Sequence, residues 1–152
     1  MSGKTTNRLA PAMIVLLGLS ALVVACTGTN ASQSASDSFP MASLATMPTK
    51  VQAAPVTVQQ AYQFAVANPE ILKQIPCYCG CGGMDHTSNY SCYVAEENAD
   101  GSTRFDDHAL GCSICVDITQ DTMRLLNQDK SVPEILAFVD QTYARFGPSN
   151  IP

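Results

Sequence analysis

Six of the seven cysteines in this 152-residue chain lie between residues 77 and 115. They form three groups: the string PCYCGC at residues 76–81, the single Cys92, and an HxxxCxxC pattern that begins at His108. Thiols gathered at this density either bind a soft metal ion or pair as disulfides. The spacing within each group indicates how the sulfur atoms can meet.

The first group is typical of a row of ligands. In an extended chain, alternate side chains point to the same side of the backbone. Cys77, Cys79 and Cys81 can therefore present three sulfur atoms along one edge.

The second group is typical of one helix face. Successive residues of a helix turn by about 100°, which places His108, Cys112 and Cys115 within about 60° of one another. Gly111 weakens a helix here by about 1 kcal/mol, so its first turn is expected to be irregular. Aliphatic residues lie beside this face, which leaves the sulfur side free to meet the PCYCGC edge.

We expect these two groups to form a metal site together. Thiolates are soft ligands that suit copper(I) or zinc(II) rather than magnesium or calcium. The thioether of Met84 lies between the two groups in the sequence and adds a further soft donor. Zinc needs only four ligands, and the surplus of sulfur favours copper(I), with zinc as the alternative. The predicted metal ligands are Cys77, Cys79, Cys81, Cys92, His108, Cys112, Cys115 and His86.

Two other interpretations of the cysteines stay open. Outside the cytoplasm, six cysteines can form three disulfides that stabilise a small interaction module. Alternatively, Cys112 and Cys115 form a thiol–disulfide redox pair, because the start of a helix favours the thiolate. No βαβ pattern surrounds this pair, and Val116 follows it where covalent haem attachment requires histidine.

The N-terminus is similar to a bacterial lipoprotein signal. Lys4 and Arg8 precede an apolar run at residues 9–25, which ends in Val23-Val24-Ala25 before Cys26. The resemblance implies a signal peptide at residues 1–25, cleavage before Cys26, and acyl chains on that cysteine. Two or more acyl chains give stable membrane anchoring. The protein is then expected on the extracytoplasmic face of the bacterial cell membrane.

Composition separates a tether from a domain. Residues 26–55 are rich in Ser, Thr, Ala and Gln, show no helical or strand period, and are predicted to be a lipidated, disordered tether. Residues 56–152 are predicted to form the cysteine-rich domain. The chain has 13 acidic and 8 basic residues, and this acidic balance argues against nucleic acid as a partner.

Four helices are predicted, so the fold class is mainly α. They begin near Thr57 with a Thr57–Gln60 capping box, at Pro69 after Asn68 as cap, near residue 113 and after Ser131. The last helix has an apolar stripe and a capping box formed by Ser131 and Glu134. Between the early and late helices we expect an irregular cysteine-rich loop or a short hairpin that turns at residues 98–101.

The string PCYCGC, with His86, Cys92 and the later HxxxCxxC pattern, resembles the PCYCGC-motif lipoprotein family. This resemblance spans residues 57–152 and implies an extracytoplasmic lipoprotein, with no activity attached. No nucleophile elbow, phosphate loop or spaced carboxylate pair is present, so we do not expect an enzyme. The sequence predicts a membrane-anchored protein that binds a soft metal for buffering or for delivery to a metalloprotein recipient.

Overall fold

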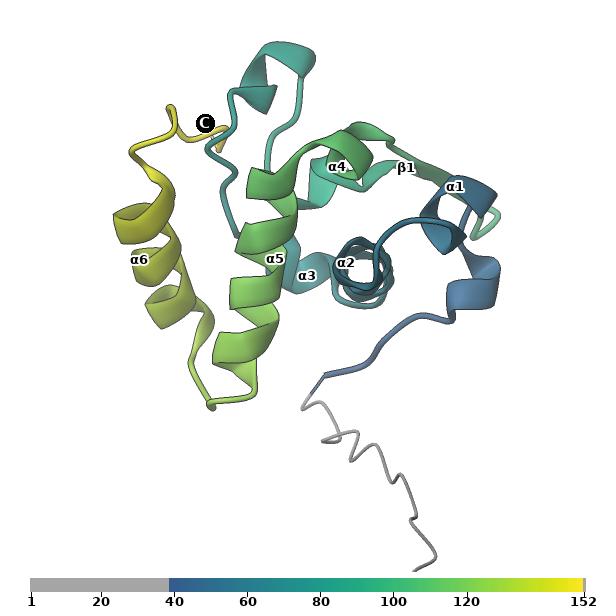
Figure 1. Ribbon diagram of the computed structural model, residues 1–152, viewed down its shortest axis with the longest axis horizontal. Coiled ribbons are helices and arrows are strands. Elements are labelled where there is room, and N and C mark those ends of the chain that lie inside the picture. Colours follow the sequence, from purple (N-terminus) through teal and green to yellow (C-terminus); the bar gives the residue numbers. More distant parts are fainter. Residues whose placement is uncertain (1–38, 152) are drawn as a thin grey trace, which may run out of the picture. The chain divides into compact units, whose positions relative to one another are not determined.

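The computed structural model describes residues 39–151, and helices dominate this part of the chain (Figure 1). The predicted mainly helical class, with a hairpin between the helices, is confirmed. No helix among residues 39–151 is long and apolar enough to cross a membrane. The expected signal peptide, Cys26 and the tether up to residue 38 lie outside the described residues. The α-helices are α1 (Thr49–Gln52), α2 (Val56–Ala67), α3 (Pro69–Leu72), α4 (His108–Gly111), α5 (Ser113–Leu126) and α6 (Val132–Tyr143).

Helices α5 and α6 lie side by side at the end of the chain (Figure 1). Their apolar stripes meet in the core, where Ile118, Ile135 and Val139 are fully buried. The predicted capping box is present, since the Ser131 side chain bonds the Glu134 backbone and the Glu134 carboxylate accepts the Ser131 N–H. Apolar periodicity therefore predicts this region well.

Helix α2 packs against α5 and begins one residue before the predicted start. Pro55 precedes it, and the expected Thr57–Gln60 capping box is wrong, because Thr57 already lies inside the helix. A proline at this position lacks an N–H to satisfy and fixes a φ angle that suits a helix start. Asn68 precedes α3 as predicted, but its side chain caps no N–H; it donates to the carbonyl oxygens of Phe64 and Pro40 instead.

Residues 39–55 correct the predicted tether. They contain α1 and a short 3₁₀ helix, Leu44–Thr46, and they bury Met47 and Val51 in the core. Phe39 packs edge-on against Phe64 of α2, with 4.9 Å between ring centroids. A few well-spaced apolar residues are enough to order this segment because they pack against the surface of α2. The domain therefore begins before residue 56.

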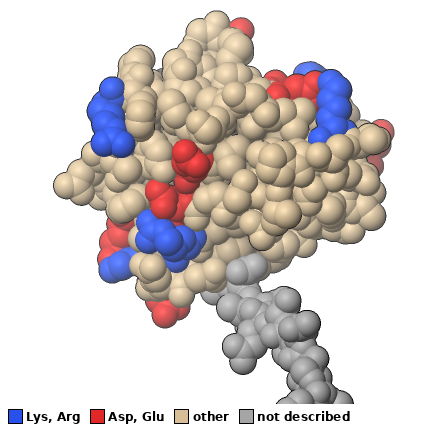
Figure 2. Space-filling view, viewed as in Figure 1, with Lys and Arg blue, Asp and Glu red and all other residues tan. Residues whose placement is uncertain are grey.

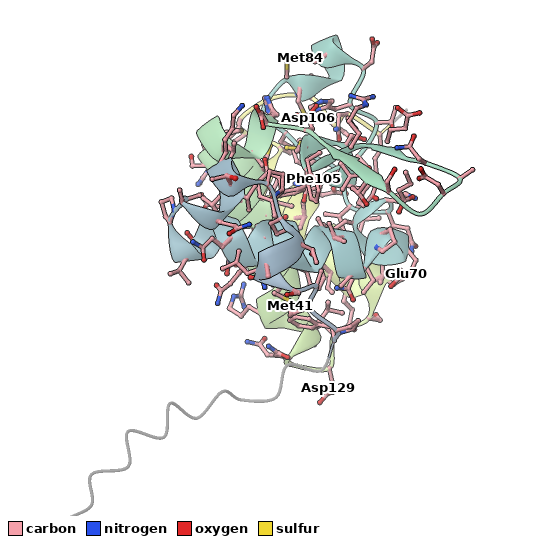
Figure 3. All side chains as sticks on the ribbon, turned by 90° about the vertical axis from the view of Figure 1, so that its right-hand side faces the viewer. Met41, Glu70, Met84, Phe105, Asp106 and Asp129 are labelled. Atoms are coloured by element: carbon pink, nitrogen blue, oxygen red, sulfur yellow. The ribbon has the colours of Figure 1, made fainter. Side chains whose placement is uncertain are left out.

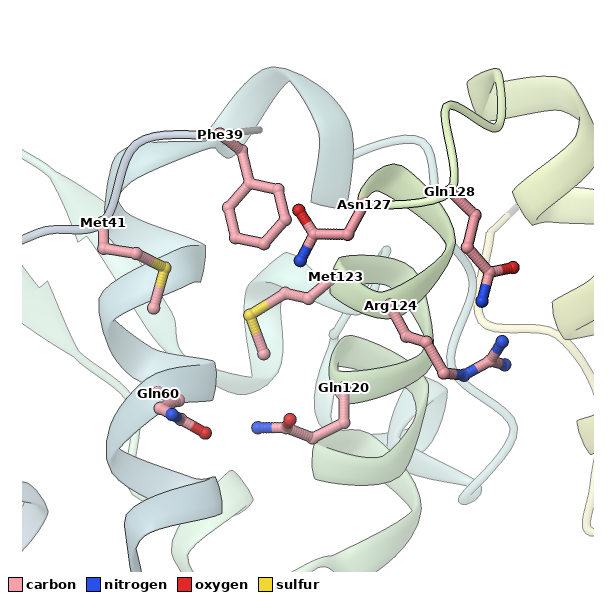
Figure 4. Close-up of a pocket in the computed structure, with 8 residues that line it drawn as sticks. All are labelled: Phe39, Met41, Gln60, Gln120, Met123, Arg124, Asn127 and Gln128. Carbon is pink, nitrogen blue, oxygen red and sulfur yellow. The ribbon is translucent and has the colours of Figure 1, made fainter. Parts of the chain in front are cut away.

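A pocket of about 400 Å³ separates this N-terminal segment from the helices (Figure 4). Phe39 and Met41 face it from the segment, Gln60 from α2, and Met123 from α5. None of the six cysteines lines it. The pocket therefore lies apart from the thiols.

The predicted hairpin is confirmed. Strands β1 (Val94–Glu97) and β2 (Thr103–Phe105) pair antiparallel, with Val94 opposite Phe105. Gly101 adopts a φ of 83° in the connecting turn, a conformation that glycine enters without strain. Because β2 ends just before residues 106–108, the hairpin fixes the approach to α4.

Charged side chains contribute little to holding this fold together. Figure 2 shows that most of one face is uncharged and that its charged residues occur in small separate groups. The ion pairs include Lys130–Glu134 and Arg104–Glu96, in which each side chain is about half exposed to solvent. Exposed pairs of this kind typically contribute below about 1 kcal/mol each.

Candidate metal centre

The PCYCGC loop follows α3 and turns back on itself. Cys77 is buried, and its Sγ lies 3.4 Å from Sγ of Cys79. Gly80 adopts a φ of 83°, which reverses the chain so that Cys81 begins the 3₁₀ helix Cys81–Met84. The three sulfur atoms of Cys77, Cys79 and Cys81 lie within 4.8 Å of one another.

The HxxxCxxC segment reaches the loop with a break in the helix. Helix α4 ends at Gly111, Cys112 is extended with φ −115° and ψ 100°, and α5 starts at Ser113. The predicted single helix face is therefore wrong, and the break lies directly after Gly111, where the sequence predicts an irregular turn. Across the break, Nε2 of His108 lies 3.4 Å from Sγ of Cys79.

Cys115 lies at the centre of the sulfur atoms. Its fully buried Sγ lies 3.2 Å from Sγ of Cys92, 3.3 Å from that of Cys77 and 3.6 Å from that of Cys79. Cys81 joins from the other side, with its Sγ 3.8 Å from that of Cys92. Three sulfur neighbours around one thiol form a network rather than a single pair.

All eight predicted cysteine and histidine ligands come together in this network. All six cysteines among residues 39–151 are free thiols. They and the two histidines form four overlapping groups whose ligand atoms lie within 4.8 Å of one another. The groups are Cys79/His108/Cys112/Cys115, Cys81/His86/Cys92/His108, Cys77/Cys79/Cys81 and Cys77/Cys92/Cys115.

Burial and sulfur contacts shift the pKa values of these thiols in opposite directions. Hydrogen bonds from Cys115 and Cys92 hold the pKa of Cys77 far below its usual value, because they stabilise the thiolate. Hydrogen bonding to Cys77 and Cys92, together with burial, raises the pKa of Cys115 far above its usual value. Burial likewise raises the pKa values of Cys79 and Cys81. These pKa shifts favour the thiolate at Cys77 and the protonated thiol at Cys79, Cys81 and Cys115.

Asn150 secures the PCYCGC loop from the C-terminal tail, and sequence reasoning missed it. Its Oδ1 accepts the N–H of Cys77 at 2.6 Å, and its Nδ2 donates to Sγ of Cys81 at 3.4 Å. Its backbone N–H also donates to the Cys77 carbonyl, at 3.2 Å. Gly147 lets the tail pass close by, since a Cβ there would lie 2.8 Å from the Tyr78 carbonyl oxygen.

A second set of polar side chains holds the backbone of Cys115 in place, and sequence reasoning missed these partners as well. The hydroxyl of Tyr93 and Nδ2 of Asn89 both donate to the Cys115 carbonyl, at 2.8 and 3.2 Å. Thr119 completes this buried network by donating to Oδ1 of Asn89 at 2.7 Å. Since these partners are separated by 22 to 30 residues, no local sequence pattern identifies them.

Together these residues form a buried thiol and imidazole cluster able to bind a metal ion. Its soft donors are far more numerous than those of a four-coordinate zinc site. No curated protein and no solved structure matches this chain at a significant level. A family model described as a protein of unknown function with PCYCGC motif matches residues 14–150, and the chain belongs to this family.

Proposed function

We propose that this protein is a membrane-anchored, extracytoplasmic lipoprotein that binds copper(I) for buffering or delivery. The observation that carries the proposal is the convergence of six thiols and two imidazoles in overlapping groups. Thiolate and imidazole nitrogen suit copper(I), and the donor surplus favours copper over one closed zinc site. A mostly buried cluster also limits access of water and oxidants to the bound ion. A binding role, rather than catalysis, accounts for these features.

The disulfide and redox alternatives explain less of the geometry. A disulfide requires two sulfur atoms about 2.0 Å apart in unique pairs, whereas Cys115 contacts three sulfur atoms at 3.2–3.6 Å. A redox pair of Cys112 and Cys115 gives no role to the other four thiols. Neither alternative uses His108, whose Nε2 lies against Cys79.

The full chain, purified anaerobically in detergent, tests the metal proposal. We expect bound copper(I), a sulfur-to-copper charge-transfer absorption in the ultraviolet, and six titratable thiols after unfolding and removal of the metal. Zinc offered at equal concentration serves as the competitor. Retention of zinc in preference to copper would reassign the metal. Protein that arrives with three disulfides and takes up no metal would refute the proposal.

Anchoring rests on the lipoprotein-like residues Val23-Val24-Ala25-Cys26. Metabolic labelling with a radioactive fatty acid should mark the wild-type protein and leave Cys26→Ser unlabelled. Cys112→Ser, which removes a cysteine of the cluster, should keep the label in the same experiment. Equal labelling of all three proteins would exclude Cys26 as the anchor.

A further inference from the structure

His86 occupies an unusual position at the edge of the cluster. Its side chain is nine-tenths buried, and its Nδ1 has no hydrogen-bond partner among the described residues. Leaving a buried nitrogen without a hydrogen-bond partner destabilises the folded protein. A nitrogen in this state is suited to a bound cation, and His86 shares a ligand group with Cys81 and Cys92.

Asp106 contacts both histidines of the cluster, the ring of His86 and the backbone of His108. Its Oδ2 lies 3.5 Å from Nε2 of His86, and its Oδ1 accepts the backbone N–H of His108 at 2.8 Å. Histidine ligands commonly donate their second ring N–H to a carboxylate, which fixes the ring and leaves the other nitrogen free for the metal. The contact with Asp106 thus leaves Nδ1 of His86 as the donor atom.

An open cavity leads to this side of the cluster. It measures about 340 Å³ and is lined by His86, Asp106 and Met84, among others. The Met84 side chain is half exposed at 52%. Figure 3 shows Met84 and Asp106 at the same end of the molecule. A thioether is a soft ligand that needs no deprotonation, so it suits brief contact with copper(I).

The donors divide into two sets that share only His108. One set holds Cys79, Cys112 and Cys115; the other holds Cys81, His86 and Cys92. Cys77 forms sulfur groups with members of both sets and lies between them. Only the second set includes a residue that lines the Met84 cavity, namely His86.

We propose that the cluster holds at least two copper(I) ions, and that the Cys81/His86/Cys92 site exchanges its ion through the Met84 cavity. This inference rests on the proposed copper function. Each exchange is a ligand substitution: copper remains copper(I), and one bond to Met84 or an incoming thiolate or thioether forms for each bond broken to the site. The Cys79/Cys112/Cys115 site is less buried, and Cys112 lines a separate cavity of about 280 Å³, but that cavity has no soft donor besides Cys112 itself. Because no side chain of this cavity can take over the ion, we expect this site to retain its ion for longer.

Copper removal by the chelator bicinchoninate tests this division on the copper-loaded full chain. Wild-type protein should release copper in a fast and a slow phase. His86→Ala should bind about one ion fewer per chain and lose the fast phase. Met84→Leu should keep the copper content and slow the fast phase about tenfold. Met41→Leu is the matched control, because Met41 lines the separate pocket near α2 and should change neither quantity.

The outcomes separate this inference from the proposed function. Wild-type protein that binds no copper refutes both. Wild-type protein that binds copper, with His86→Ala unchanged in content and kinetics, refutes the exchange site alone. Loss of all copper from His86→Ala shows a single undivided cluster and also overturns the inference. Equal slowing by Met84→Leu and Met41→Leu removes the assigned path.

Discussion

The α5–α6 pair and the cysteine-rich segment at residues 77–112 hold their shapes by different means. The helices bury a continuous apolar stripe, including Ile118, Ile135 and Val139. The cysteine-rich segment has only single-turn helices and a short hairpin, and its buried residues include three cysteines, three tyrosines and the polar side chains of His86, Ser88 and Asn89. The helical pair is therefore stable through apolar burial, while the cysteine-rich segment depends more on buried polar and sulfur contacts and leaves Nδ1 of His86 without a hydrogen-bond partner among the described residues.

The largest effect is expected from pH, which should change the copper affinity of the cysteine-rich segment. Burial raises the pKa values of Cys79 and Cys81, so these thiols are protonated at neutral pH and release protons when a metal binds. Copper affinity should therefore fall as pH falls, by about 100-fold per unit for an ion that displaces two protons. Competition titrations between about pH 8 and about pH 6 measure this slope. An affinity independent of pH would mean that neither Cys79 nor Cys81 is a ligand.

Replacing the central sulfur should give the next largest effect. Cys115→Ser removes the sulfur that contacts Cys77, Cys79 and Cys92. Copper affinity should drop by about 100-fold or more, beyond the effect of altering a ligand's surroundings. Hydrogen exchange should show lost protection in residues 77–92, with α6 still protected. Equal loss in both regions would contradict their independence.

The core of the helical pair should respond to a buried charge. Val139 is fully buried, so Val139→Asp places a carboxylate without a partner in the core and should cost about 3 kcal/mol or more. Gln141→Asp, at an exposed position of the same helix, should change stability by less than about 0.5 kcal/mol. Urea unfolding of both variants gives the comparison. Similar midpoints would show that the stripe does not pack as described.

The C-terminal tail links the two regions, and Asn150 tests that link. Asn150→Ala removes the hydrogen bonds to Cys77 and Cys81. Copper affinity should fall about tenfold, since this residue orients the ligand loop. Asn98→Ala, in the exposed hairpin turn, should leave affinity unchanged. Should both variants bind copper equally well, the tail has no part in shaping the site.

The smallest effect is expected at the start of α6. Ser131→Ala removes the side chain that accepts from the helix start and should cost about 1 kcal/mol of folding stability. Thermal unfolding followed by circular dichroism measures this cost. Copper content should stay the same, because the side chains of Ser131 and Glu134 interact with each other and with Lys130 rather than with the cluster. A change in copper content would tie α6 directly to the site.

The sequence by itself determined the parts of this protein that depend on local patterns. Apolar periodicity and the Ser131–Glu134 pair defined α6, and the turn residues at 98–101 defined the hairpin. Local patterns gave a wrong capping residue for α2, because Pro55 rather than Thr57 precedes the helix. They also failed at residues 39–55, whose order depends on the surface of α2.

Only the tertiary structure decided how the cluster is assembled. Residue types indicated which side chains could bind a metal, but Cys92 and Cys115, 23 residues apart, meet only because the chain folds back. Asn150 and Asp106 act at the site through contacts with Cys77 and His86, which lie far from them in the sequence. Long-range packing sets these distances, and spacing along the chain carries no record of them. The sequence therefore predicted which side chains could bind a metal, but it did not predict how these donors are grouped in space.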